Sequence, residues 1–146
     1  LREEGLPLRR KVLGAEHPET LKAMANLAIS YSDAGRREET LKLREEVLIL
    51  CKKVLGAEHP DTLKAMANLA VSYFDAGRMD EEFKLSEELL ALRRKVLGPE
   101  HPDTLSSMRY LAVSYRTKGD TTRAESLEKE IAAAKAKLQA PPPVTK

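Results

Sequence analysis

The sequence predicts an all-α repeat protein built from antiparallel helix pairs. Two observations predict this fold class: a segment recurs every 42 residues, and apolar residues inside each repeat are spaced by three and four. The alternation with period two that is typical of strands is absent. The recurring segment occupies Val12–Leu21, Val54–Leu63 and Val96–Leu105.

Repeated glycines divide the chain into repeat 1 (14–55), repeat 2 (56–97) and repeat 3 (98–139). Repeats 1 and 2 are identical at 30 of 42 positions, and repeats 2 and 3 at 18. Residues 1–13 align with the end of a repeat, so we expect them to form the second helix of a preceding, truncated repeat. Residues 140–146 are rich in proline and are expected to be a disordered tail.

The first helix of each repeat is expected to begin at a proline and to end before a glycine. Proline is tolerated in the first turn because the amide there has no helical partner, and glycine readily adopts the left-handed conformation that ends helices. The prolines are Pro18, Pro60 and Pro102, and the glycines are Gly35, Gly77 and Gly119. In repeat 2 the predicted buried stripe of this helix is Leu63, Met66, Ala70 and Tyr73.

The second helix of each repeat opens with acidic residues and closes with basic ones, which complements the helix dipole. In repeat 2 its predicted buried stripe is Leu85, Leu89, Leu92 and Val96. The last helix, Thr121 to about Gln139, replaces leucines by alanines and is expected to be a C-terminal capping helix.

A period of 42 also suits HEAT or armadillo arrays and propeller blades, but 4% aromatic residues argue against propellers. A local signature separates the remaining options. The motif Asn-Leu-Ala-x-x-Tyr begins at Asn26 and Asn68, with Tyr110 in the third repeat, and follows Leu-Gly-x-x-His-Pro-Asp/Glu-Thr. It resembles tetratricopeptide repeats of the 42-residue kind found in kinesin light chains.

This resemblance implies a right-handed superhelical solenoid whose first helices line a concave, peptide-binding groove. The groove positions it implies are Lys22, Asn26, Ile29, Asp33, Lys64, Asn68, Val71, Phe74, Asp75, Arg109, Tyr110, Val113 and Arg116. Early in the second helix this family usually has a small alanine, whereas the chain has Thr40, Glu82 and Ala124.

Three groove residues have a specific expected role, each with an alternative. A side-chain amide donates and accepts at once, so Asn26 and Asn68 are expected to hold the backbone of an extended peptide. The alternative is that each amide satisfies a neighbouring helix end. Phe74 is a second candidate for ligand contact, because its equivalents are Ser32 and Arg116; the alternative is packing against the next repeat.

No catalytic, metal or cofactor site is expected. The chain lacks a phosphate-binding loop, a His-Glu-x-x-His motif and a nucleophile elbow. His17, His59 and His101 occupy the same turn of different repeats, so we expect a structural role in the turn rather than a shared metal ion. His-Pro-Asp also marks J-domain cochaperones, but here it recurs with the repeat. Cys51 is expected to be a buried core residue.

The charge balance and the hydropathy exclude some classes of binding partner. With 25 basic and 23 acidic residues, nucleic-acid binding is not expected, and the run Arg93–Lys95 is interpreted as a solvated helix end. No apolar run is long enough to cross a membrane, and a single cysteine suits a reducing compartment, so a cytoplasmic location is expected.

We therefore expect a non-catalytic interaction scaffold that binds a peptide of a partner protein. Lys64, Arg109 and Arg116 favour a ligand with an acidic side chain or a C-terminal carboxylate. Two alternatives remain open: end-to-end self-association of near-identical repeats, and a sensor domain at the C-terminal end of a larger signalling protein.

Overall fold

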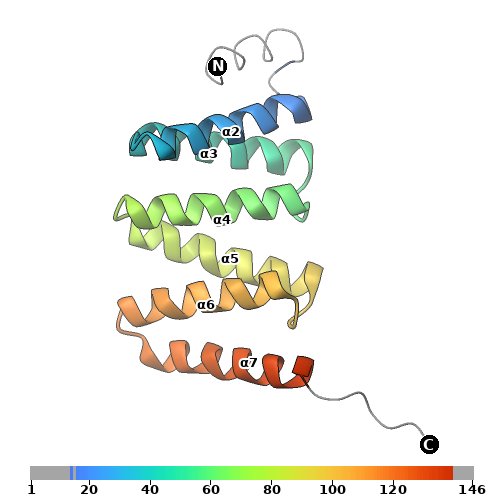
Figure 1. The fold of residues 1–146 in the computed structure, drawn as a ribbon, viewed down its shortest axis with the longest axis vertical. Coiled ribbons are helices and arrows are strands. Elements are labelled where there is room, and N and C mark those ends of the chain that lie inside the picture. Colours follow the sequence, from blue (N-terminus) through green and yellow to red (C-terminus); the bar gives the residue numbers. More distant parts are fainter. Residues whose placement is uncertain (1–13, 15, 140–146) are drawn as a thin grey trace, which may run out of the picture. The chain divides into compact units, whose positions relative to one another are not determined.

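The computed structural model describes residue 14 and residues 16–139, which contain six α-helices and no strand. The helices are α2 (Pro18–Asp33), α3 (Arg37–Val54), α4 (Pro60–Asp75), α5 (Met79–Leu97), α6 (Pro102–Thr117) and α7 (Thr121–Gln139) (Figure 1). The predicted all-α class and the two helices per 42 residues are confirmed. The expected helix in residues 1–13 and the expected tail in 140–146 lie outside the described residues.

The chain divides into two compact units, Leu1–Leu85 and Ser86–Lys146. In unit 1, α2 and α4 both contact α3. In unit 2, α6 contacts α7. Each unit thus contains a first helix packed against a second helix, as the repeat pattern predicts.

The ends of the first helices are built as the sequence predicts. Gly77 has a φ of +74°, which side chains other than glycine rarely adopt. This conformation lets the Arg78 amide donate to the Tyr73 carbonyl at 2.9 Å and the Gly77 amide donate to the Phe74 carbonyl at 3.0 Å. The same bonds end α2 at Gly35 and α6 at Gly119. The end of each first helix is therefore encoded by one glycine.

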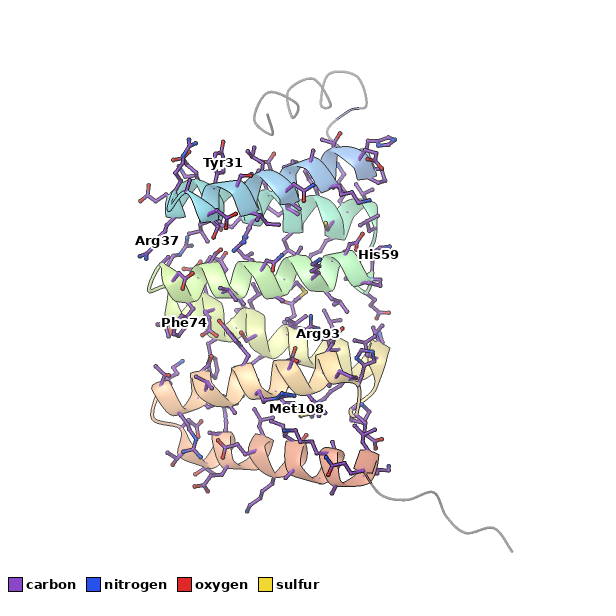
Figure 2. All side chains as sticks on the ribbon, in the orientation of Figure 1. Tyr31, Arg37, His59, Phe74, Arg93 and Met108 are labelled. Atoms are coloured by element: carbon purple, nitrogen blue, oxygen red, sulfur yellow. The ribbon has the colours of Figure 1, made fainter. Side chains whose placement is uncertain are left out.

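The core consists of the predicted apolar stripes. Leu63, Met66, Ala70 and Tyr73 are all buried. Met66 and its equivalents Met24 and Met108 are 0%, 0% and 1% exposed, so these methionines are among the most deeply buried side chains. Met108 is labelled in Figure 2. On α5 the stripe differs from the prediction: Leu92 is only half-buried and Val96, in the last turn of the helix, is 39% exposed, whereas Leu90 is buried beside Leu89.

The early position of each second helix, where similar repeats usually have an alanine, is buried in all three repeats. Thr40 is 4% exposed, Glu82 1% and Ala124 0%. The Thr40 hydroxyl donates to the Arg36 carbonyl at 2.8 Å, which satisfies its polar group without a tertiary partner. The fold therefore accepts side chains of three sizes at one site.

The hydroxyl of Tyr73 donates to Glu45 Oε2 at 3.0 Å and joins α4 to α3. Burial, followed by the hydrogen bond to Glu45, raises the pKa of Tyr73 from 10.0 to about 12. A pKa that is raised in the folded state gives stability that is complete below the pKa of the unfolded chain, and that is lost as the pH rises through the folded value.

We therefore expect the free energy of unfolding to fall between pH 10 and pH 12. Urea denaturation at several pH values across this range measures the fall. Tyr73→Phe removes the titrating group and should make the fall shallower. An unchanged slope in Tyr73→Phe would assign the pH dependence to other groups.

Candidate functional site

The loop before each first helix is fixed by its histidine. Nδ1 of His59 accepts a hydrogen bond from the Asp61 amide at 3.1 Å and caps the N-terminus of α4. His17 and His101 cap α2 and α6 in the same way. The predicted structural role of the three histidines is confirmed.

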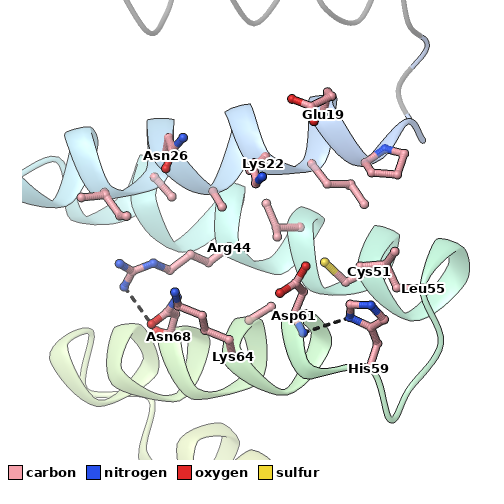
Figure 3. A pocket seen from close by; sticks show the side chains of 17 residues that line it. Glu19, Lys22, Asn26, Arg44, Cys51, Leu55, His59, Asp61, Lys64 and Asn68 are labelled. Carbon is pink, nitrogen blue, oxygen red and sulfur yellow. Dashed lines mark hydrogen bonds between the residues drawn. The ribbon is translucent and has the colours of Figure 1, made fainter.

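A cavity of about 530 Å³ lies in unit 1 between α2 and α4, with α3 as its floor (Figure 3). Its polar lining combines side chains from both walls with one from the floor. These polar residues are Glu19, Lys22, Asn26, Arg44, His59, Asp61, Lys64 and Asn68. The apolar lining includes Ile29 and, from α3, Val47 and Cys51. A cavity with an apolar base and several convergent polar groups is the usual form of a binding site.

The cavity brings together five of the predicted groove residues: Lys22, Asn26, Ile29, Lys64 and Asn68. Because 42 residues separate Lys22 from Lys64 and Asn26 from Asn68, each pair presents the same side chain from the two facing helices. Asn68 is half-buried, and its carboxamide makes no hydrogen bond to any residue that the structure describes.

The other predicted groove residues of unit 1 do not line this cavity. Val71 and Phe74 are 43% and 42% exposed on α4, and Asp33 and Asp75 are exposed at the ends of α2 and α4. Val71 is equivalent to Ile29, which is also 43% exposed. The first helices therefore leave large apolar side chains open to solvent at the predicted positions.

In unit 2, Val113 is 60% exposed and Arg109 is exposed on α6, whereas Tyr110 is half-buried. Arg116 forms two bonds of 2.8 Å to the carboxylate of Glu128 on α7. This ion pair within unit 2 competes with any ligand for the Arg116 guanidinium.

Of the basic run at the end of α5, Arg94 and Lys95 are exposed as the sequence suggested, whereas Arg93 is only partly solvated. Arg93 is half-buried and donates to the Asp103 carbonyl at 3.2 Å and to Ser107 Oγ at 2.7 Å. Arg94 pairs with Glu130 at 2.7 Å. A charge run could not reveal these partners, because they lie on α6 and α7.

Arg44 is the functional candidate that sequence reasoning missed. Its Nη1 donates to the Asn68 carbonyl at 3.2 Å and to Ser72 Oγ at 2.7 Å, so it joins α3 to α4 beside the cavity. In the sequence it stands in an ordinary charged segment, Arg44 to Glu46. The sequence feature that could have identified Arg44 is its difference from the equivalent residues of the other repeats, Ser86 and Glu128.

Burial governs the electrostatics of the cavity floor. Desolvation lowers the pKa of Arg44, and the charge of Asp75 opposes this effect. Desolvation raises the pKa of Cys51, and the nearby Asp61 carboxylate adds to the shift. Cys51 is 4% exposed, as predicted for a core residue, and a neutral thiol is a poor nucleophile.

Among the described helices, none combines the length and the hydropathy that a transmembrane span requires. Among the described residues, no three His, Cys, Asp or Glu side chains come together in an arrangement that could hold a metal ion.

Comparison with known proteins shows what the chain is similar to. A tetratricopeptide repeat profile matches residues 23–88 and 67–137. Among solved structures, one similar protein is a candidate kinesin light chain from Podosopora anserina with nearly identical TPR-like repeats. It is 33% identical with a TM-score of 0.83, and the match covers 96% of this chain and 66% of that one. Curated proteins gave no match.

A single-substitution variant of the same Podosopora anserina protein has 33% identity and a TM-score of 0.82 over 94% of this chain and 65% of that one. BtubC (BKLC) from P. vanneervenii has a TM-score of 0.86 over 99% of this chain and 58% of that one. At 19% identity, it supports the fold alone. The chain spans less than two thirds of the length of these three structures.

Proposed function

Because the chain belongs to the tetratricopeptide repeat family, with repeats like those of kinesin light chains, we propose that the cavity of unit 1 binds an extended peptide of a partner protein. Tetratricopeptide repeats are generally protein–protein interaction scaffolds and are typically non-catalytic. The proposal specifies where on this chain the peptide would bind and which side chains would contact it.

The observation that carries the proposal is the carboxamide of Asn68. It lines the cavity, is half-buried, and has no hydrogen-bond partner within the described part of the chain. The half-buried carboxamide has both a donor and an acceptor to offer, and a peptide backbone supplies the matching acceptor and donor. Asn26 lines the opposite wall and could bond the same strand of ligand.

Apolar and basic side chains supply the remaining contacts. Ile29 lines the cavity and is 43% exposed, so an apolar ligand side chain would cover it. Lys22 and Lys64 are exposed on the two walls, and neither forms an ion pair with any described residue. They favour a ligand that carries an acidic side chain or a C-terminal carboxylate.

Asn26→Ala combined with Asn68→Ala should weaken peptide binding about tenfold or more, since each lost hydrogen bond contributes about 0.5–1.5 kcal/mol. Isothermal calorimetry with a peptide selected from a random library measures the change, and we expect an affinity of roughly micromolar for the unaltered chain. Ser32→Ala, an exposed change on α2 outside the cavity, is the control. Equal binding by the double variant would reject the proposed role of the two asparagines.

Self-association is less well supported as a function. Of the residues in α7, only Ala124, Leu127, Ile131 and Ala134 are buried, and the exposed remainder is mostly polar or alanine. A second copy stacked on this surface would bury little apolar area. The role of a sensor domain within a larger signalling protein stays a prediction.

A further inference from the structure

The side chain of Arg44 reaches from α3 into the space between α2 and α4, beside Asn68 (Figure 3). We propose that Arg44 is a specificity-determining residue: its guanidinium binds one carboxylate of the ligand, and this fixes the register in which a peptide lies along near-identical repeats. The inference rests on the proposed function and deepens it by naming the group that selects the ligand.

The guanidinium is held in place and still has donors to offer. Nη1 is anchored by the carbonyl of Asn68 and the hydroxyl of Ser72. Nε and Nη2 make no hydrogen bond to any residue that the structure describes. Since Ser72 is 7% exposed, the anchor is itself buried and stable. An arginine with one nitrogen fixed presents its remaining N–H groups as a pre-oriented fork, which suits a carboxylate.

The charge of Arg44 lacks a contact partner. Both of its anchors are neutral oxygens, and no carboxylate lies within ion-pair distance among the described residues. Asp75 acts only over a longer range, and burial already disfavours the charged guanidinium. A half-buried cation without a counter-ion gains more from a bound anion than an exposed one does, because water screens it less.

The surroundings favour an anion at this place in the cavity. Lys22 and Lys64 approach from the two walls and add two further basic side chains to that of Arg44. The cavity also contains Glu19 and Asp61, which both belong to the first turns of their helices. Arg44 and Asn68 lie further along, towards the middle of α3 and α4 (Figure 3). Glu19 and Asp61 therefore lie one turn from Lys22 and Lys64 on their own helices, and the three basic side chains outnumber the two acidic ones in the lining.

Because the repeats are so similar, a bound peptide needs a residue that fixes its position along them. Repeats 1 and 2 share 30 of 42 residues, and Asn26 and Asn68 would hold any peptide backbone in the same way. Backbone contacts to these two asparagines alone would not fix which ligand residues face them. Arg44 breaks this equivalence, because the corresponding residues of repeats 2 and 3 are Ser86 and Glu128.

The test uses libraries of fluorescein-labelled dodecapeptides with amide-capped C-termini, random except for one central residue fixed as aspartate, glutamate or asparagine. A fourth library has the central asparagine and a free C-terminus, which separates a side-chain carboxylate from a terminal one. Fluorescence anisotropy compares their binding to the unaltered chain, to Arg44→Gln and to Arg37→Gln. The glutamine introduced by Arg44→Gln keeps an amide donor for the anchors without the charge, and Arg37 is an exposed arginine at the start of α3.

We expect the unaltered chain and Arg37→Gln to bind a carboxylate library about tenfold more tightly than the amide-capped asparagine library. Arg44→Gln should lose this preference and keep its affinity for the asparagine library. Preference that persists in Arg44→Gln overturns the inference, as does the absence of preference in the unaltered chain. In both of those cases, binding of the asparagine library leaves the proposed function standing. If no library binds, the proposed function fails and the inference fails with it.

Circular dichroism verifies that each variant is folded. If Arg44→Gln is unfolded, Arg44→Lys takes its place, because lysine keeps the charge and loses the fork. The preference for a carboxylate should then fall several-fold, and an undiminished preference would overturn the inference.

Discussion

Met66→Ala should lower the free energy of unfolding by about 2–5 kcal/mol. Met66 is 0% exposed in the core of unit 1, so truncation removes buried apolar contacts and leaves a void that the packed helices fill only in part. Since a small domain is stable by only about 5–15 kcal/mol, this is a large share of the total. Urea denaturation followed by circular dichroism measures the loss.

Val71→Ala is the matched control for this prediction. Val71 lies on the same helix but is 43% exposed, so the same helix-favouring residue is introduced with little loss of packing. We expect Val71→Ala to change the free energy of unfolding by no more than about 0.5 kcal/mol. Equal destabilisation by the two variants would contradict the assignment of the methionines to the core.

Thr62→Val should lower the free energy of unfolding by about 1–3 kcal/mol, although valine has nearly the same shape and volume as threonine. Thr62 is 0% exposed, and its hydroxyl donates to the Gly56 carbonyl at 2.7 Å, closing the loop that precedes α4. Valine leaves that carbonyl with only the long bond of 3.4 Å from the His59 amide. A half-buried acceptor that loses its shorter hydrogen bond is left poorly satisfied, which destabilises the folded state.

Thr122→Val makes the same chemical change at an exposed position of α7, where no described residue depends on the hydroxyl. Its denaturation midpoint should match that of the unaltered chain. If Thr62→Val and Thr122→Val unfold at the same urea concentration, the loop hydrogen bond does not contribute to stability as proposed.

Much of the fold could be predicted from the sequence, because each local signal agrees with the next. Helix starts at Pro18, Pro60 and Pro102 follow from proline and its histidine cap, and helix ends follow from glycine with a positive φ. The buried methionines follow from apolar spacing alone. Local chemistry sets these features, so a single sequence contains them.

The contacts between helices could not be predicted in the same way. Arg44 was hidden in a charged segment, since its partners Asn68 and Ser72 lie 24 and 28 residues further along. Arg116 was expected to face a ligand, and its pairing with Glu128 on α7 could not be predicted from the sequence. Charged side chains are long, and periodicity does not state which neighbouring helix they reach.

Whether the cavity of unit 1 is the peptide site is tested most directly by nuclear magnetic resonance of the isotope-labelled chain, titrated with a peptide selected from the library. The backbone and side-chain amide resonances of Asn26 and Asn68 should shift most, together with those of Lys22, Arg44 and Lys64. Shifts confined to other surfaces, such as the part of α3 that carries the 66%-exposed Ile49, with the cavity resonances unchanged, would contradict a peptide site between α2 and α4.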